Sequence, residues 1–105
     1  MKTLSSHGES YLPLPSHPAR FLPGGIYITP MAQAALTQYD VLRALSCHLR
    51  GEWGQVFDSE VSANERAVRK GRRVLSTHRS STSVMFLVVT ERDRVSTTIL
   101  LAEED

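Results

Sequence analysis

The chain has 105 residues, of which 41% are hydrophobic and 22% are charged. This length suits one domain with a single modest core and leaves no room for a second domain. Twelve Lys and Arg against eleven Asp and Glu give a formal charge of +1, so no global field holds the protein on nucleic acid or on anionic lipid.

Cysteine content and hydropathy indicate a cytoplasmic protein. Cys47 is the only cysteine, which excludes an intramolecular disulfide and favours a reducing compartment. Residues 1–10 contain one Lys and no continuous apolar run of the kind that a signal peptide needs. No apolar run approaches the ~18 residues of a membrane span, so we expect no membrane association.

Residues 1–25 are rich in Ser, His, Gly and Pro, with single apolar residues between them. Repeated Pro disfavours helix, so this stretch is predicted to be a flexible Pro-rich arm. The alternative is a docking peptide for a partner or for the second copy of a dimer, because Tyr11, Leu14 and Phe21 would gain from burial.

A short strand and a helical region are predicted next. Ile26, Tyr27 and Ile28 alternate like an edge strand, and Thr29 followed by Pro30 is a good N-cap with Pro at the first helical position. The helix is predicted to run from residue 30 to residue 50. Residues 37–40 could interrupt it, because Asp40 could cap a second helix as readily as lie inside one.

Trp53, the only tryptophan, lies between Gly51 and Gly54. As a structural residue it would close one end of a small core. As a functional residue it would be an exposed partner anchor, with Glu52 beside it, because tryptophan dominates interface energetics where the core does not need it.

A second helix is predicted to end at Lys70, before Gly71. It begins either at Asp58 and Ser59 or at Ser62, with Glu65 completing a capping box. A basic cluster occupies its C-terminal part and the residues that follow. Its members are Arg66, Arg69, Lys70, Arg72 and Arg73.

The last third of the chain predicts a three-stranded antiparallel meander. Residues 73–78 form its first strand, and residues 84–101 form a hairpin of two apolar, β-branched runs around four charged residues. Residues 84–89, in the middle strand, are all apolar, so both faces of this strand are apolar. We therefore expect both faces to be covered, with a second subunit as one way to cover the outer face.

The predicted fold class is α+β, with two or three N-terminal helices packed on the meander and a short extra N-terminal strand as an option. The predicted organisation is a flexible arm (1–25), one α+β domain (26–102) and an acidic tail (103–105).

Motifs for catalysis and cofactors are weak. His48 and Cys47 are neighbours that point to different sides of a helix, so no metal site is expected. No nucleophile elbow or phosphate-binding glycine loop is present, and no cofactor is expected. The alternative enzyme is a small ribonuclease resembling barnase or RelE in layout. Its candidate residues are His78, Arg79, Arg92, Arg94, Ser96, Thr97 and Thr98.

The basic cluster has two interpretations besides protein binding. It could contact nucleic-acid phosphates, in which case salt would weaken the binding. It could equally be a solvated helix end, because cations there complement the helix dipole and Glu65 can pair with Arg69. Aromatic residues do not interleave with the charges, which argues against stacking on single strands.

Several motifs resemble a family of short proteins of plasmids, phages and genomic islands, often labelled "type I restriction endonuclease subunit M". The matching motifs are Gly-Gly-Ile-Tyr-Ile-Thr-Pro at 24–30, His-Leu-Arg-Gly-Glu-Trp-Gly at 48–54, Thr-Glu-Arg-Asp-Arg at 90–94 and Thr-Thr-Ile-Leu-Leu at 97–101. The family usually has Asp where Glu52 stands, and ends in Pro-Glu-Glu-Tyr. A methyltransferase subunit needs a cofactor-binding Rossmann domain, which this length cannot supply.

The resemblance implies a mobile-element setting, in which many small proteins bind and block host defence machinery. The predicted function is therefore a non-enzymatic protein-interaction module, an inhibitor or modulator of host defence. Candidate contact residues are Trp53, Glu52 and the basic cluster, and a homodimer through the sheet or the arm is expected.

Overall fold

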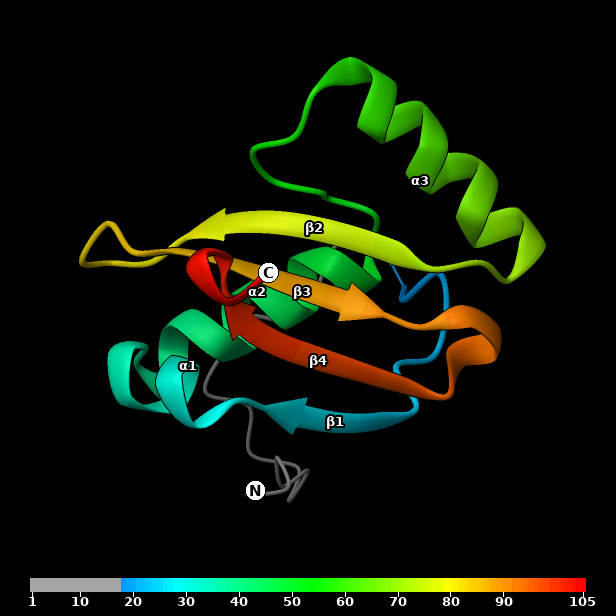
Figure 1. Ribbon diagram of the computed structural model, residues 1–105. Helices are drawn as coiled ribbons and strands as arrows, with labels where there is room; N and C mark the ends of the chain where they lie inside the picture. The colour runs from blue at the N-terminus through cyan, green and yellow to red at the C-terminus, as the bar shows by residue number, and fades with distance from the viewer. Residues whose placement is uncertain (1–17) are drawn as a thin grey trace.

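A four-stranded mixed sheet in the order β1-β4-β3-β2 forms the centre of the protein (Figure 1). The computed structural model describes residues 18–105, and the predictions made for residues 1–17 lie outside this part. The strands are β1 (Gly25–Ile28), β2 (Val74–Arg79), β3 (Met85–Thr90) and β4 (Ser96–Leu101). The protein is therefore α+β, as predicted.

The three C-terminal strands form the predicted antiparallel meander, and β1 extends it. The optional N-terminal strand is present, but it pairs in parallel with β4, so the sheet is mixed and β3 and β4 are its central strands. Backbone hydrogen bonds from Gly25 to Val95 and from Thr29 to Ile99 fix both ends of β1. Ile26 and Ile28 thereby pack against the main core.

Two helices follow β1, where one interrupted helix was predicted. α1 (Pro30–Ala35) has Thr29 as its N-cap and Pro30 at N1, as predicted. α2 (Gln38–Leu49) begins after Thr37, whose hydroxyl accepts from the Asp40 backbone N–H. Asp40 is thus the third residue of α2 and completes a capping box, and the predicted cap role belongs to Thr37.

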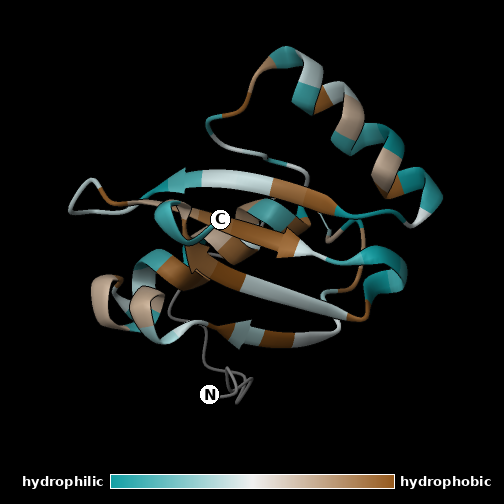
Figure 2. Cartoon of the chain, viewed as in Figure 1, coloured by the Kyte–Doolittle hydropathy of each residue, from teal (hydrophilic) through white to brown (hydrophobic). Residues whose placement is uncertain are grey.

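The main core lies between α2 and one face of the sheet (Figure 1). Its buried residues are Ala32, Leu36, Val41, Ala44, Leu45, Phe86, Val88, Ile99 and Leu101. Figure 2 shows how strongly β3 is hydrophobic and how hydrophilic α3 (Asp58–Lys70) is by comparison. This difference matches their positions, because β3 is central and α3 is peripheral.

Within residues 18–105, the opposite face of the sheet has no helix across it. In this part of the chain, the short 3₁₀ turn η2 (Ala102–Glu104) folds back against β3 there (Figure 1). Leu87 and Val89 on this face are nonetheless buried, at 6% and 2% exposed. Helices of the described residues thus cover one face of the sheet, and coverage of the outer face by a second subunit stays a prediction.

α3 lies along the edge of β2, where the sequence predicted packing on the face of the sheet. The Asn64 side chain donates to the Leu75 carbonyl at 2.8 Å and accepts from the Leu75 N–H at 3.3 Å. The apolar side of α3 is narrow, with Ala67 buried and Val68 half-buried, so this helix cannot cover a face of the sheet. It instead satisfies an edge that would otherwise be open to other strands.

The loop before α3 covers the rest of this edge. The Thr77 N–H donates to the Trp53 carbonyl at 3.0 Å, and the Gln55 N–H donates to the Thr77 carbonyl at 2.8 Å. Gly54 adopts φ 75° at this point, and a Cβ there would lie 2.0 Å from the Thr77 oxygen. Only glycine therefore allows the loop to approach β2 this closely.

Both predicted domain boundaries fall inside ordered structure. The Arg20 N–H donates to the Leu49 carbonyl at 2.7 Å and Phe21 is buried, so part of the predicted arm belongs to the domain. At the other end, Glu104 accepts hydrogen bonds from the Thr29 hydroxyl at 2.8 Å and the Leu101 N–H at 2.7 Å. The acidic tail is thus anchored to the start of α1.

Asp40 joins the start of α2 to the turn between β2 and β3. Its carboxylate accepts from Thr37 and from both the N–H and the hydroxyl of Ser81, the latter two at 3.0 Å. Burial alone would raise the pKa of Asp40, but the hydrogen bonds from Ser81 and Thr37 outweigh it and lower the pKa. The ionised carboxylate is therefore the form that holds this junction.

We predict that Asp40→Ala lowers the free energy of unfolding by about 2 kcal/mol, because it removes the carboxylate of the α2 capping box and leaves the Ser81 donors without their acceptor. Urea unfolding followed by circular dichroism measures the change. Gln38→Ala, an exposed change in the same helical turn, is the control and should alter stability little. Equal effects of the two changes would contradict this role of Asp40.

Candidate functional site

A chain of buried polar side chains joins α2 to the sheet, centred on His48. The His48 Nδ1 atom lies 2.7 Å from the Ser76 hydroxyl, and its Nε2 atom lies 2.8 Å from the Thr90 hydroxyl. On one side the chain continues from Ser76 to Nε2 of His78 at 2.7 Å. On the other side Thr90 meets Thr97 at 2.7 Å.

The far end of the chain fixes the direction of every hydrogen bond in it. Thr97 donates its one hydroxyl proton to the Pro23 carbonyl at 2.7 Å. Thr90 must therefore donate to Thr97, and it can only accept from His48. His48 is thus protonated on Nε2 and accepts on Nδ1 from Ser76, which in turn accepts from Nε2–H of His78.

Both histidines are held in the neutral form. Burial lowers the pKa of His48 to about 3, and repulsion from His78, when that ring is protonated, and from Arg94 adds to the effect. Burial also lowers the pKa of His78 to about 4, with Arg43 contributing. A proton added to either ring would convert an acceptor into a donor or place a charge in the core.

A serine between two imidazoles has the elements of an activated nucleophile, but Ser76 and His48 are both 0% exposed. No substrate atom can reach the Ser76 hydroxyl in this conformation. The network instead satisfies polar groups on four elements and holds them in register.

The residues of the ribonuclease alternative do not converge. His78 and Arg79 lie at the end of β2, whereas Arg92 and Arg94 lie in the turn beside its beginning. Hydrogen bonds from Asp93 to Gly71 and from Arg94 to Arg72 fix that turn at the far end of the strand. Thr97 is fully buried. His78 and Arg79 are therefore separated from Arg92 and Arg94 by the length of β2.

Trp53 belongs to the core, so the interpretation as an exposed anchor does not fit the structure. The side chain is 4% exposed and stacks on Phe21, with ring centroids 6.3 Å apart. Its indole N–H donates to Glu65 at 3.2 Å, and Glu65 also pairs with Arg20 at 2.8 Å. This second cluster of Phe21, Trp53, Ala67 and Val74 exists because residues 18–23 return to cover it.

Glu52 lies at the surface next to Trp53, but it is engaged. Its carboxylate pairs with Arg50 at 2.9 Å, beyond the end of α2. This ion pair is local, and Glu52 lies in the loop that separates α2 from α3. Glu52 thus comes from a different segment of the chain than the basic cluster.

The basic cluster divides into two surfaces. Arg66 and Arg69 are exposed on α3 and Lys70 is its last residue, whereas Arg72 and Arg73 follow Gly71, which takes φ 67° and turns the chain. Arg92 joins the second group, because the Asp93 N–H donates to the Gly71 carbonyl at 2.9 Å. We call Lys70, Arg72, Arg73 and Arg92 the basic end.

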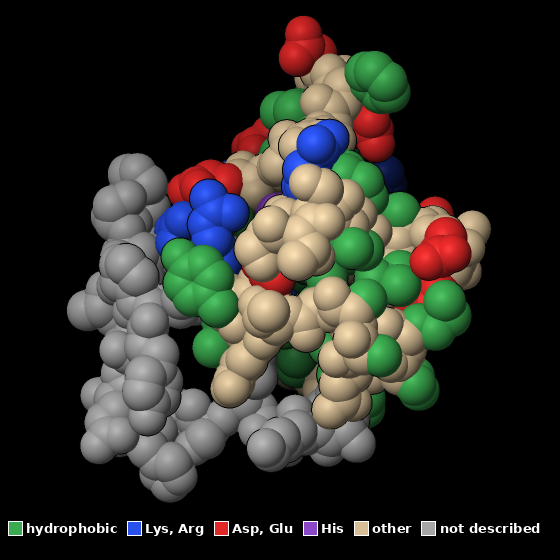
Figure 3. Space-filling view, turned by 90° about the vertical axis from the view of Figure 1, so that its left-hand side faces the viewer, with side chains coloured by type: hydrophobic (Ala, Val, Ile, Leu, Met, Phe, Trp, Pro, Cys, Tyr) green, Lys and Arg blue, Asp and Glu red, His purple; other side chains and the backbone are tan. Residues whose placement is uncertain are grey.

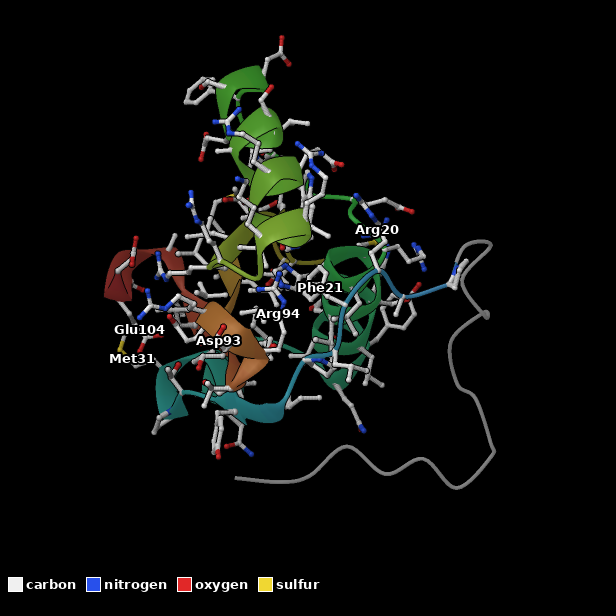
Figure 4. All side chains as sticks on the ribbon, turned by 90° about the vertical axis from the view of Figure 1, so that its right-hand side faces the viewer. Arg20, Phe21, Met31, Asp93, Arg94 and Glu104 are labelled. Atoms are coloured by element: carbon white, nitrogen blue, oxygen red, sulfur yellow. The ribbon has the colours of Figure 1, made fainter. Side chains whose placement is uncertain are left out.

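Arg94 connects the turn after β3 to the C-terminal end of α3, next to the basic end. Asp93 and Arg94 both have positive φ, at 60° and 59°, which are uncommon values for residues other than glycine. This conformation sends the Arg94 guanidinium to the carbonyls of Arg72 and Ala67, at the C-terminal end of α3. The same group lies 4.9 Å from the centre of the Phe21 ring (Figure 4). The sequence alone gives no sign of this role, because Arg94 is there one of several cations near predicted strand ends.

Counterions at the basic end are few. Arg73 pairs with Glu91 at 3.4 Å, with both side chains about half exposed. Asp93 is the other acid in this region. The exposed cations therefore outnumber the acids, which leaves an electropositive surface on a protein of almost neutral net charge.

Within residues 18–105, no group of three or more His, Cys, Asp or Glu is placed to hold a metal ion. No helix in the same part of the chain is long and apolar enough to cross a membrane. Comparison of the chain with protein-family models, curated proteins and solved structures finds no match. The function must therefore be inferred from the surfaces of this protein itself.

The histidine network predicts loss of stability in acid. Between about pH 6.5 and pH 4 the unfolded histidines bind protons that folded His48 and His78 do not, so unfolding takes up protons and stability falls as the pH falls. The free energy of unfolding should drop by up to about 1.4 kcal/mol per pH unit for each histidine.

Urea unfolding at steps from pH 7 to pH 4.5 measures this slope. His78→Gln keeps an amide donor for Ser76 but does not titrate, so it should show about half the slope of the wild type. A wild-type stability that stays constant over this window would contradict the neutral state of the two rings.

Proposed function

We propose that the protein is a non-enzymatic protein-interaction module of a mobile genetic element, and that it modulates a host defence protein. Its contact surface is the basic end. The observation that carries the proposal is the excess of exposed cations there, on a turn that Arg94 and Asp93 fix to the end of α3.

Rigid support favours binding by such a surface. Two contacts hold the end of α3 and the turn that carries Arg92 in one arrangement. They are the hydrogen bond from Arg94 to the Ala67 carbonyl and the hydrogen bond from the Asp93 N–H to the Gly71 carbonyl. A preorganised surface loses less conformational entropy on association. Opposite charge on the partner would also speed the encounter.

An acidic protein surface fits better than a nucleic acid. Glu91 and Asp93 lie among the cations and would repel phosphates, whereas a protein can present both signs of charge. No aromatic residue lies among the four cations of the basic end to stack on bases. The mobile-element setting that the motifs imply points to a defence protein as the acidic partner.

The test is affinity capture from lysate of a host of the mobile element, with nuclease treatment, using wild type and Arg72→Glu/Arg92→Glu. We expect a stoichiometric protein partner whose affinity falls about 10- to 100-fold in the variant, since two charged contacts are reversed. Arg43→Glu, an exposed cation on α2, is the matched control and should retain the partner. Retention by the double variant would contradict the assignment of the surface.

Nucleic-acid binding is the second candidate, because the same cations could contact phosphates. A mobility-shift titration with duplex and single-stranded DNA and RNA at rising salt separates the two functions. Binding that weakens steeply with salt, together with capture of nucleic acid and no protein, would favour this candidate. No shift at low salt would remove it.

A further inference from the structure

The face of the sheet opposite α2, which we call the outer face, is apolar. Phe86 and Val88 point into the main core, so the alternating residues Leu87 and Val89 belong to the outer face. The strand register places further side chains of this face beside them. These are Leu75 on β2, Thr98 and Leu100 on β4, and Tyr27 on β1.

The accessible apolar surface of the outer face surrounds its two central side chains. Leu87 and Val89 are buried, whereas Leu75 and Leu100 are half-buried and Tyr27 is 52% exposed. In Figure 3 hydrophobic side chains gather on the right, which is the side that faces the reader in Figure 1. An antiparallel sheet that meets water on one face usually carries polar residues there. The apolar composition therefore indicates a binding surface.

Tyr27 extends this surface across the edge strand. A Cβ built on Gly25 would lie 3.0 Å from the Tyr27 hydroxyl oxygen and 3.1 Å from its Cε2 atom, so the ring lies over the Gly25 backbone. The glycine leaves the space that the ring occupies. An aromatic side chain already ordered in this way loses little conformational entropy when a partner covers it.

The two ends of the outer face differ in charge. At one end η2 follows β4 and folds back against β3, and Glu103 and Asp105 are exposed there. At the other end lie the turn that carries Arg92 and the residue that precedes β2, Arg73, where exposed cations outnumber acids. The outer face is therefore acidic at one end, apolar in the middle and basic at the other end.

We propose that a second copy of this chain covers the outer face, with the two sheets packed face to face. The twofold axis lies between the sheets and runs perpendicular to the strands. η2 of each copy then meets the turn that carries Arg92 in the other copy, and the apolar middles cover each other. Each contact away from the axis is made twice.

The charge distribution selects both this occupant and its orientation. A surface joins a second copy of itself across a twofold axis only when it is complementary to itself. Acid at one end and base at the other provide that complementarity when the copies are reversed. With the axis along the strands, the two acidic η2 turns would face each other. They would also hold the sheets apart, because η2 lies at the margin of the molecule on the side away from α2, where Figure 4 labels Glu104.

The size of the outer face predicts a weak dimer. Four strands about 4.8 Å apart, with up to six residues of about 3.3 Å each, give roughly 400 Å² of flat sheet on each copy. Side-chain relief and the η2 contacts add to this area. The interface thus lies near the lower limit of specific association, about 1,200 Å² in total, so we expect a dissociation constant in the micromolar range.

Sedimentation velocity of the purified full chain over micromolar to millimolar concentrations tests the proposal. Wild type should form a dimer that weakens as salt rises. Tyr27→Ser should raise the dimer dissociation constant about 10-fold, and Leu100→Lys should prevent dimerisation because it would bury a charge. Circular dichroism verifies that each variant is folded. Tyr39→Ser, at an aromatic side chain 56% exposed on α2, is the matched control and should dimerise like the wild type.

Glu103→Lys tests the orientation. In the reversed alignment it places a cation against Arg92 of the other copy, so it should weaken the dimer about 10-fold, and combining it with Arg92→Glu should restore the affinity. With η2 against η2, the same change would remove a repulsion and strengthen the dimer.

Three results would overturn the proposal. They are a wild type that stays monomeric at every concentration, a Tyr27→Ser protein that dimerises normally, and a Glu103→Lys protein that dimerises more tightly. The purified chain is measured without a host protein, so these outcomes are independent of the function proposed for the basic end.

Discussion

A neutral histidine sealed between α2 and the sheet is the constraint on which the remaining structure depends. His48 can hold Ser76 and Thr90 together only as one tautomer, and that tautomer is set by the Pro23 carbonyl at the far end of the chain. No buried side-chain polar atom in residues 18–105 is left without a partner. Such a fully satisfied network specifies one arrangement, because any slip of a strand would leave a buried hydroxyl or imidazole unpaired.

The same network determines what the surface can do. Because Thr97 bonds to Pro23, the chain before β1 is held beside the sheet, and Phe21 is inserted between His48, Trp53 and Arg94. Arg94 can then reach the end of α3, which fixes the turn that carries Arg92. The position of the basic end thus depends on the buried histidine, through the contacts of His48 with Phe21, of Phe21 with Arg94 and of Arg94 with the end of α3.

The parts of the fold that the sequence predicted well are those with local causes. Thr29 and Pro30 start α1, Gly71 ends α3, and the two β-branched runs of residues 84–101 form a hairpin, all through interactions between near neighbours. The pairing of β1 with β4, the place of α3 at the edge of β2 and the burial of Trp53 depend on contacts far apart in the chain. From the sequence alone, His48 suggests only a candidate metal ligand. Its real partners could be recognised only once the register brought Ser76 and Thr90 to the same face.

The basic cluster shows why spacing along a chain does not define a surface. Five cations within eight residues suggested one patch, but helical periodicity turns Arg66 and Arg69 outward while Gly71 redirects the residues that follow it. Arg92, twenty residues away, belongs with the second group.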